Sequence, residues 1–223
     1  MKSLWKQFDR LVVFDTETTG IEFGTDRIIE IGAAALENGE EQGGFNALIR
    51  LPAGQTLPHF ITQLTGITDE QLRDEGVDER TAAEGFCRLL DCAEQPLLVA
   101  YNAQFDLGFL YYFLNGFGKA GVLKNVRMLD ALTVYRDRRP FPHKLCDAVA
   151  AYSLVSQNTH RAIDDTKATY ELLCAMDAEE PDLHRYINLF GYNAKYGVSG
   201  QRISSVSYRP QGYENKTKLY MQP

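Results

Sequence analysis

The amino-acid sequence predicts an α/β protein, in which helices pack on the faces of a central sheet. Strand-like segments open the chain, and helices then alternate with further strands. The 223 residues are 44% hydrophobic, enough to bury one sizeable core. Length alone favours one domain over two.

Three strands are expected first. Residues 11–15 form an apolar run rich in β-branched side chains, as in a buried strand, and 27–36 is similar. Gly39 marks a turn, after which 45–51 alternates apolar and polar residues. The chain should therefore open with a β-meander, and two later strands are expected at 96–100 and 126–129.

The helices are expected from apolar side chains that recur with helical spacing. The clearest example is 79–92, whose apolar stripe includes Phe86, Leu89 and Leu90. The full set is 58–65, 79–92, 103–115, 130–137, 144–152 and 161–178. After residue 180 the pattern weakens, apart from an alternating stretch at 203–208. We therefore expect a first unit of residues 1–180 and a C-terminal extension, 181–223, of unknown role.

Charge and composition restrict the class of protein. The net charge of −7 argues against a protein that coats nucleic acid electrostatically, although residues 186–223 hold five Lys or Arg against one acid. No apolar run is long enough to span a bilayer, and the first ten residues lack the apolar stretch of a signal peptide. The four cysteines lack metal-site spacing, so buried, reduced thiols and a cytoplasmic location are expected.

Carboxylates recur where predicted strands end and helices begin. Asp15 and Glu17 lie two residues apart at the end of a strand, so their side chains point to one face. Asp106 falls in the first turn of a helix, where compensation of the helix dipole is an alternative explanation. His160 and Asp165 bracket the start of the last long helix. Grouped carboxylates suit magnesium or manganese.

Three separated blocks resemble the DEDDh exonucleases, the family of the proofreading subunit of bacterial DNA polymerase III and of ribonuclease T. The blocks are 13–20 (VFDTETTG), 102–106 (NAQFD) and 160–165 (HRAIDD). Arg161 stands where the sister group has tyrosine, and Tyr101 stands where relatives often have histidine. The resemblance covers roughly residues 1–180 and implies a ribonuclease H-like exonuclease fold with a mixed five-stranded sheet flanked by helices.

The resemblance also implies a mechanism and a site. Two Mg²⁺ or Mn²⁺ ions would be held by the four carboxylates of Asp15, Glu17, Asp106 and Asp165, with His160 as the general base. The terminal nucleotide would contact Thr16, Thr18, Leu64, Thr65 and Ile67. The expected substrate is single-stranded nucleic acid, DNA favoured over RNA, cut from its 3′ end to release nucleoside monophosphates. A polymerase or a repair protein is the expected partner class, with no membrane involved.

Two other functions stay open at this point. The same set of metal ligands would serve an RNA exonuclease, because nothing in the sequence reports on the 2′-hydroxyl. A non-catalytic, polymerase-associated binding module is the second alternative, but such a protein would be expected to lose ligands, and all four carboxylates and the histidine are present. The basic stretch 136–139 with Lys144 could contact phosphate, although a solvated helix end is the preferred interpretation.

Overall fold

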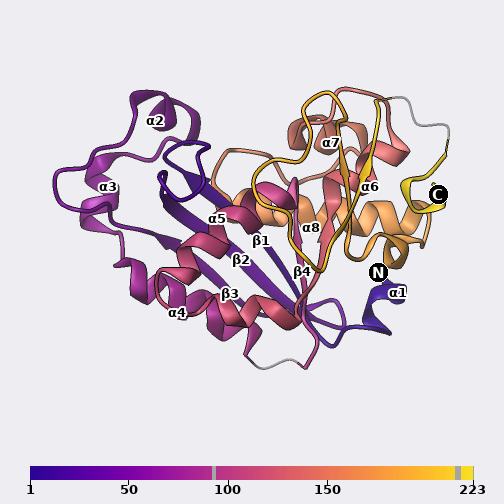
Figure 1. Ribbon diagram of the computed structural model, residues 1–223, viewed down its shortest axis with the longest axis horizontal. Coiled ribbons are helices and arrows are strands. Elements are labelled where there is room, and N and C mark those ends of the chain that lie inside the picture. The colour runs from indigo at the N-terminus through magenta and orange to yellow at the C-terminus, as the bar shows by residue number, and fades with distance from the viewer. Residues whose placement is uncertain (92–93, 214–216, 223) are drawn as a thin grey trace.

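The computed structural model describes residues 1–91, 94–213 and 217–222, and its centre is a mixed sheet of five strands (Figure 1). The strand order is β3-β2-β1-β4-β5, with β1 antiparallel to β2 and parallel to β4. The strands are β1 (Leu11–Thr18), β2 (Ile28–Glu37), β3 (Glu40–Leu48), β4 (Leu97–Ala100) and β5 (Arg127–Asp130). The predicted α/β class and five-stranded mixed sheet are confirmed.

Eight α-helices and three short 3-10 helices accompany the sheet in the described residues. They are α1 (Lys2–Trp5), α2 (His59–Thr65), α3 (Asp69–Asp74), α4 (Glu79–Leu90), α5 (Ala103–Asn115), η1 (Ala120–Asn125), α6 (Ala131–Arg138), α7 (Leu145–Ala151), α8 (Ala162–Glu179), η2 (Leu183–Tyr186) and η3 (Leu219–Met221). Among the described helices none is long and apolar enough to cross a membrane.

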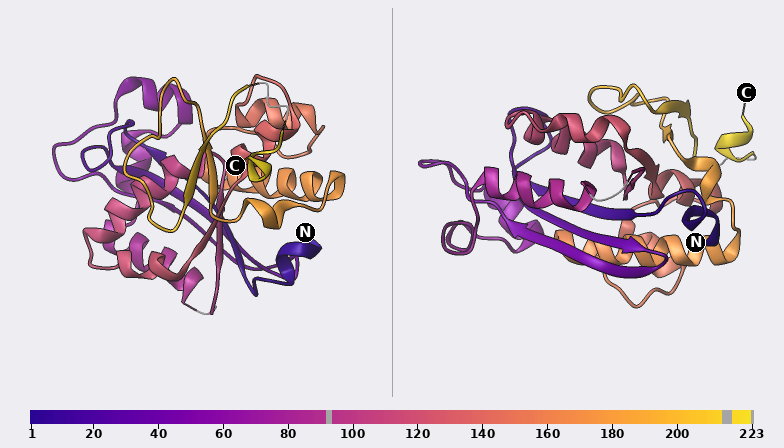
Figure 2. Two further views of the ribbon diagram at one scale, coloured as in Figure 1. Left: turned by 45° about the vertical axis from the view of Figure 1, so that its right-hand side comes forward. Right: turned by 90° about the horizontal axis from the view of Figure 1, so that it is seen from below.

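Helices cover both faces of the sheet (Figure 2). In β1, Val12 and Phe14 pack into a core with α4 and α5, whereas Leu11 and Val13 pack into a second core with α6 and α8. Because the strand is buried on both faces, its sequence is a continuous apolar run rather than an alternating one. A third, smaller cluster joins α2 and α3 to Ile29 of β2.

Three details differ from the expectations. The strand predicted at 45–51 is β3, which already begins at Glu40 because Gly39 turns the chain with a positive φ of 88°. The helix predicted at 79–92 is α4, which ends at Leu90, and its predicted last residue, Cys92, lies outside the described residues. The prediction of buried thiols is wrong for Cys146, which is exposed, whereas Cys87 is buried.

The long helix α8 lies directly against β2. A Cβ atom added at Gly32 would lie 2.4 Å from the carbonyl carbon of Ala162, and the Thr166 hydroxyl donates to the Gly32 carbonyl oxygen at 3.0 Å. The absence of a side chain at Gly32 thus brings the first turn of α8 close to the sheet.

Gly32→Ala should therefore destabilise the protein. The new methyl group would meet backbone atoms, and overpacking of this kind costs about 1 to 3 kcal/mol. For a chain of this size that corresponds to a fall in Tm of roughly 2–4 °C per kcal/mol. The matched control is Gly43→Ala in β3, where no atom lies within 4 Å of the added Cβ. Equal melting temperatures for the two variants would contradict the close approach.

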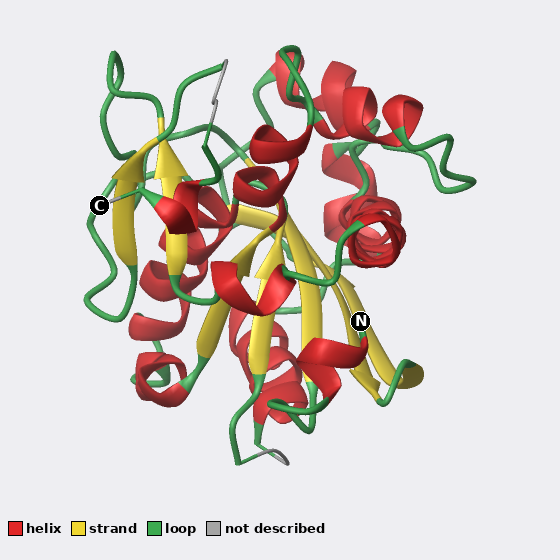
Figure 3. Cartoon of the chain, turned by 90° about the vertical axis from the view of Figure 1, so that its right-hand side faces the viewer, coloured by secondary structure: helices red, strands yellow, loops and turns green. Residues whose placement is uncertain are grey.

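The segment 181–223 is packed against the rest of the chain. Its strands β6 (Leu189–Tyr192) and β7 (Ser207–Pro210) form a separate parallel pair beside the main sheet (Figure 3). The alternating stretch at 203–208, which was not assigned a structure, overlaps only the first two residues of β7, and β6 was not predicted. Phe190 enters the first core and Leu219 the second.

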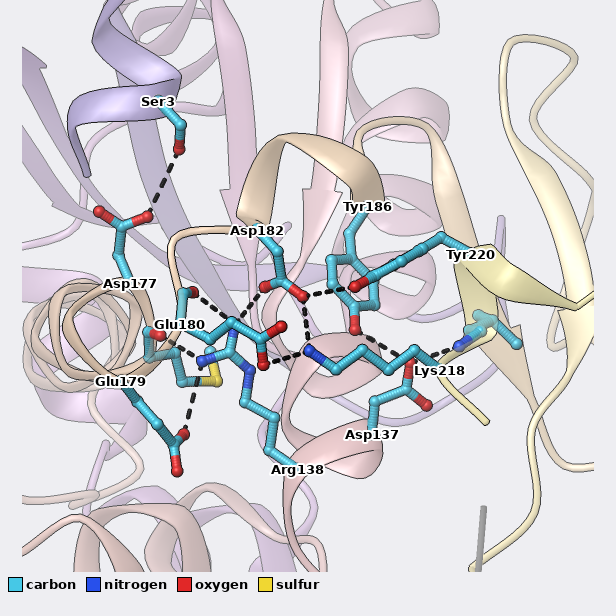
Figure 4. Close-up of polar contacts among 12 residues, drawn as sticks. Ser3, Asp137, Arg138, Asp177, Glu179, Glu180, Asp182, Tyr186, Lys218 and Tyr220 are labelled. Carbon is cyan, nitrogen blue, oxygen red and sulfur yellow. Dashed lines mark hydrogen bonds and ion pairs between the residues drawn. The ribbon is translucent and has the colours of Figure 1, made fainter. Parts of the chain in front are cut away.

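A buried polar network holds this segment in place (Figure 4). Arg138 is paired with Asp182 and Glu179, and only 3% of its side chain is exposed. Lys218 and the Tyr220 hydroxyl also donate to Asp182, each at 2.8 Å. Removing one partner would leave buried charge uncompensated. The network therefore fastens the end of the chain to α6 and α8.

Candidate active site

The predicted site residues come together at the end of β1. Asp15 and Glu17 lie opposite Gly32 and Glu30 of β2 in the antiparallel register, and the pairing shifts between Glu17 and Thr18. The regular pairing of β1 with β2 therefore ends at Glu17, directly beside the two acidic side chains. The strand thus delivers two carboxylates to one end of the sheet.

Asp106 is brought to the same place by α5. It lies in the first turn and is 3% exposed, and its Oδ1 accepts from the Thr16 backbone N–H at 3.0 Å and from the Thr16 hydroxyl at 2.7 Å. The start of α5 is fixed by Asp130, whose Oδ1 accepts from the Ala103 backbone N–H at 3.1 Å. These bonds to β1 and β5 hold the carboxylate against Thr16.

Asp165 and His160 come from the start of α8. The helix begins at Ala162, so His160 lies in the preceding loop as predicted, with a positive φ of 56° and an exposed ring. Asp165 is buried, and it accepts from the Asn158 side chain and, at 3.1 Å, from the Thr159 backbone N–H. The loop before α8 is thus tied to the carboxylate that α8 carries.

Glu30 is a part of the site that the sequence analysis missed. Its fully buried carboxylate pairs with Arg161 at 2.8 Å and accepts from the Ala162 backbone N–H at 3.0 Å. Negative charge at a helix N-terminus is favourable. Glu30 therefore connects β2 to the residue that follows His160. A glutamate in an otherwise apolar buried strand was the available signal.

The electrostatics of the cluster are those of crowded, buried acids. Burial, followed by repulsion from Asp106, Glu17 and Asp165, raises the pKa of Asp15 well above its usual value. Burial also raises the pKa of Glu17 to about 9, with Asp165 the largest charged contributor. The pKa of Asp106 rises to about 7 and that of Asp165 to about 6, both mainly through burial. Deprotonating all four carboxyls therefore requires compensating positive charge.

The donor set fits a hard divalent cation. Glu17, His160 and Asp165 each offer an atom within 4.8 Å of the other two. Carboxylate oxygens are the ligands that Mg²⁺ and Mn²⁺ prefer. The mutual repulsion that raises the pKa of Asp15 is the electrostatic environment that such a cation would relieve.

Stability without metal should decrease as the pH rises. A carboxyl whose pKa is higher in the folded protein stabilises that state when protonated, and this contribution is lost above the unfolded pKa of about 4. With folded pKa values of about 6, 7 and 9 for Asp165, Asp106 and Glu17, the free energy of unfolding should decrease progressively from weakly acidic to alkaline pH.

We therefore expect the Tm measured in EDTA to fall between about pH 5 and pH 8, within the window set by these pKa values. Mg²⁺ or Mn²⁺ should raise Tm more at the higher pH, because protons compete with the cation less there. Thermal unfolding at both pH values measures this. A metal-induced shift of equal size at both would argue against the carboxylate cluster as the binding site.

The five predicted nucleotide contacts are placed in two groups. Thr16 and Thr18 are buried in β1, and the Thr18 hydroxyl donates to the Gly20 carbonyl oxygen at 2.5 Å. Around α2, the Leu64 side chain is 49% exposed, whereas Thr65 and Ile67 are buried, and the Thr65 hydroxyl accepts from the Ile67 backbone N–H at 3.0 Å. Leu64 is thus the side chain of the α2 group that is open to a ligand.

The basic stretch 136–139 is not a solvated helix end, and the preferred interpretation of it was wrong. Arg138 is buried in the network described above, and Arg139 pairs with Glu179 at 2.8 Å and stacks over Tyr152. Arg136 donates to the Gly191 carbonyl oxygen at 3.3 Å. These three cations thus connect the end of α6 to the end of α8 and to the C-terminal segment.

Comparisons with known proteins agree with this architecture. The RNase_T family model, described as exonuclease, matches residues 12–173. A DNA polymerase III of PolC type from Clostridium perfringens is 36% identical over 84% of this chain, and the 3′-5′ exonuclease DinG of Bacillus subtilis is 39% identical over 72%. The chain spans 12% and 17% of the length of these relatives, respectively.

Solved structures show the same fold. E. coli Exonuclease I in complex with a dT13 oligonucleotide superposes with a TM-score of 0.72 at 20% identity, over 80% of this chain and 43% of that one. The nuclease domain of 3′hExo, a DEDDh family member bound to rAMP, has a TM-score of 0.65 at 16% identity, over 79% of this chain and 96% of that one. The chain therefore belongs to the RNase_T exonuclease family, and the predicted resemblance to DEDDh exonucleases is confirmed.

Proposed function

We propose that the chain is a metal-dependent exonuclease that releases nucleoside monophosphates from the 3′ ends of single-stranded DNA. One observation carries the proposal: four carboxylates from β1, α5 and α8 gather with a histidine at one end of the sheet, where burial raises all four pKa values and acidic neighbours raise those of Asp15 and Glu17 further. Family membership and the relatives' names support the reaction class.

Asp15, Glu17, Asp106 and Asp165 would hold two Mg²⁺ or Mn²⁺ ions, which when bound neutralise charge on the phosphate and on the leaving oxygen. The protein's own part is to fix the ligands before substrate arrives. Thr16 orients the Asp106 carboxylate through two hydrogen bonds, and Asn158 and Thr159 do the same for Asp165.

His160 would act as the general base. Its ring is exposed and lies within 4.8 Å of ligand atoms of both Glu17 and Asp165, so it can reach a water molecule beside the scissile phosphate. The ring would take the proton of that water as the oxygen attacks phosphorus. Glu30 and Arg161, which fix the backbone beside His160, would be positioning residues.

The terminal nucleotide would pack against α2. Phe60 and Leu64 are four residues apart on this helix and are 58% and 49% exposed, so they form one apolar patch. Stacking on such a patch tolerates any base. Thr16 and Thr18 would add contacts from β1, with Thr65 and Ile67 supporting Leu64 from the buried side.

The choice of polymer and partner rests on the relatives. Exonuclease I has been solved with DNA oligonucleotides, which favours single-stranded DNA. The rAMP bound to 3′hExo keeps RNA as a second candidate substrate. Similarity to PolC-type polymerases favours action on DNA ends beside a polymerase, in replication or repair.

The requirement for a free end can be tested with two forms of one DNA. Linear single-stranded DNA and its covalently closed circle are incubated with the protein and Mg²⁺ or Mn²⁺, and acid-soluble products are identified. Mononucleotides should be released from the linear form alone. Cleavage of the circle would indicate an endonuclease, and oligonucleotide products would contradict stepwise release.

A further inference from the structure

A cleft of about 700 Å³ lies outside the site described above, between α5, η1 and the 199–205 loop of the C-terminal segment. From α5 it is lined by Gly108, Tyr111, Tyr112 and Asn115, which share one helix face. The opposite wall includes Arg202 and Ser204. The cleft therefore exists only because the C-terminal segment packs beside α5.

Phe23 fixes this arrangement. A Cβ added at Gly108 of α5 or at Gly200 of the loop would lie 2.4 Å from the Phe23 ring, so both glycines allow the ring to fit between the two walls. Gln104 strengthens the contact by donating to the carbonyl oxygens of Ser199 and Gln201 at 2.8 and 2.9 Å. The loop is thus attached both to α5 and to the segment between β1 and β2.

The lining of the cleft has the chemistry that binds single-stranded nucleic acid. Tyr111 and Tyr112 are 44% and 41% exposed, which leaves ring surface open for stacking. Lys124 and Arg202 add positive charge, and none of the described lining residues is acidic, in a chain whose net charge is −7. Grooves that combine cations with stacking aromatics are typical of single-strand binding.

These cations differ from Arg138 and Arg209, which also lie in or against the C-terminal segment. Arg138 is paired with acids, and Arg209 donates to the backbone carbonyls of Leu219 and Gln222. Arg202 lies over the rings of Tyr208 and Tyr192, and within the described residues it forms no ion pair, nor does Lys124. Their charge is therefore left for a ligand.

The cleft is built on the same helix, α5, that carries Asp106 of the carboxylate cluster. Leu107 and Gly108, which line it, follow Asp106 on α5, and Tyr112 lies six residues further than Asp106. That separation corresponds to about 9 Å of helix rise. With about 3.6 residues per helical turn, Gly108, Tyr111 and Tyr112 face away from the buried Asp106, so a strand whose 3′ end is at Asp106 must pass around α5 to reach the exposed tyrosines.

We propose that this cleft binds the single strand on the 5′ side of the terminal nucleotides, with bases stacked on Tyr111 and Tyr112 and phosphates beside Arg202 and Lys124. The inference rests on the proposed function for the polarity of the strand. It assigns to the segment 181–223 the role of completing the nucleic-acid track.

The test is fluorescence anisotropy of labelled dT12 and dT2 in EDTA, so that binding is measured without metal-dependent cleavage. Tyr112→Leu should weaken dT12 binding about tenfold, in the range of one lost stacking contact, with a smaller effect on dT2. Tyr112→Phe keeps the ring and should bind as the wild type does. Arg202→Gln and Lys124→Gln should each reduce the salt slope for dT12 by about 0.7.

Lys6→Gln, at an exposed position between α1 and β1, is the matched control for charge and should change neither the affinity nor the slope. Equal melting temperatures would show that each variant is folded. If dT12 affinity were unchanged in Tyr112→Leu, Arg202→Gln and Lys124→Gln, the inference would be overturned and the cleft would fit a protein partner instead. If the wild-type protein hydrolysed no DNA, the proposed function would be overturned. If the cleft variants nevertheless lost dT12 affinity, the cleft would still be assigned as a single-strand binding site.

Discussion

Asp15→Asn is expected to lower kcat/KM on single-stranded DNA by roughly three orders of magnitude, since bound cations contribute several kcal/mol to phosphoryl-transfer transition states and each 1.36 kcal/mol is tenfold. Asp15 is the carboxylate whose pKa is raised by four acidic neighbours, Asp106, Glu17, Asp165 and Glu30, in addition to burial. The isosteric amide keeps the shape of the side chain and removes its charge. Initial rates with Mg²⁺ and Mn²⁺ measure the effect.

The matched control is Asp9→Asn, an exposed acid before β1 at the opposite end of the strand. It should retain wild-type rates. Asp15→Asn should also melt at a higher temperature than the wild type in EDTA, because it removes repulsion from the cluster. This separates lost activity from lost folding. A variant that is stable, folded and still within tenfold of the wild-type rate would show that Asp15 holds no essential cation.

His160→Ala should lower kcat by about 10² to 10⁴, the usual contribution of a positioned general base. The ring is exposed and none of the hydrogen bonds that orient Asp165 comes from it, so the fold should tolerate the change. The four carboxylates stay in place. The increase in Tm caused by Mg²⁺ should therefore persist in this variant, in contrast to Asp15→Asn.

Turnover and metal-dependent melting measured on the same preparation distinguish the two roles. Near-normal turnover of His160→Ala would exclude the general-base role. Loss of both turnover and the Mg²⁺-induced Tm increase would make His160 a metal ligand rather than the base.

The main sheet could be predicted because burial on both faces determines its sequence. β1 and β2 are apolar runs with strong strand signals, and α4 carries clear apolar periodicity, whereas α5 is apolar on most of its faces. The short elements could not be predicted as well. α1 and β6 each have only four residues, too few for a clear periodic pattern. The parallel partner of β6, β7, begins 18 positions after β6 does, so no local turn signals the pairing. The capping box of α3, Thr68 with Gln71, was a readable signal that was overlooked.

The candidate site was predictable in composition and not in its supporting contacts. Three motif blocks placed Asp15, Asp106 and Asp165 at element ends, and the sheet brings these ends together. The pairing of Glu30 with Arg161 spans 131 residues and follows from the packing of α8 on β2. The local cluster of basic residues around Arg138 suggested a solvated helix end. Its acidic partners, Glu179 and Asp182, lie about 40 positions later in the sequence and could not be identified from the local pattern.

The most direct test of the central claim is a time course with 5′-labelled single-stranded DNA and RNA of identical sequence, with Mg²⁺ or Mn²⁺ and with Asp15→Asn as the control. The account predicts a ladder that shortens stepwise from the 3′ end, faster on DNA, and no ladder with the variant. Full-length label on both polymers with the wild-type protein and either metal would contradict the account and favour a binding module that has the fold without the activity.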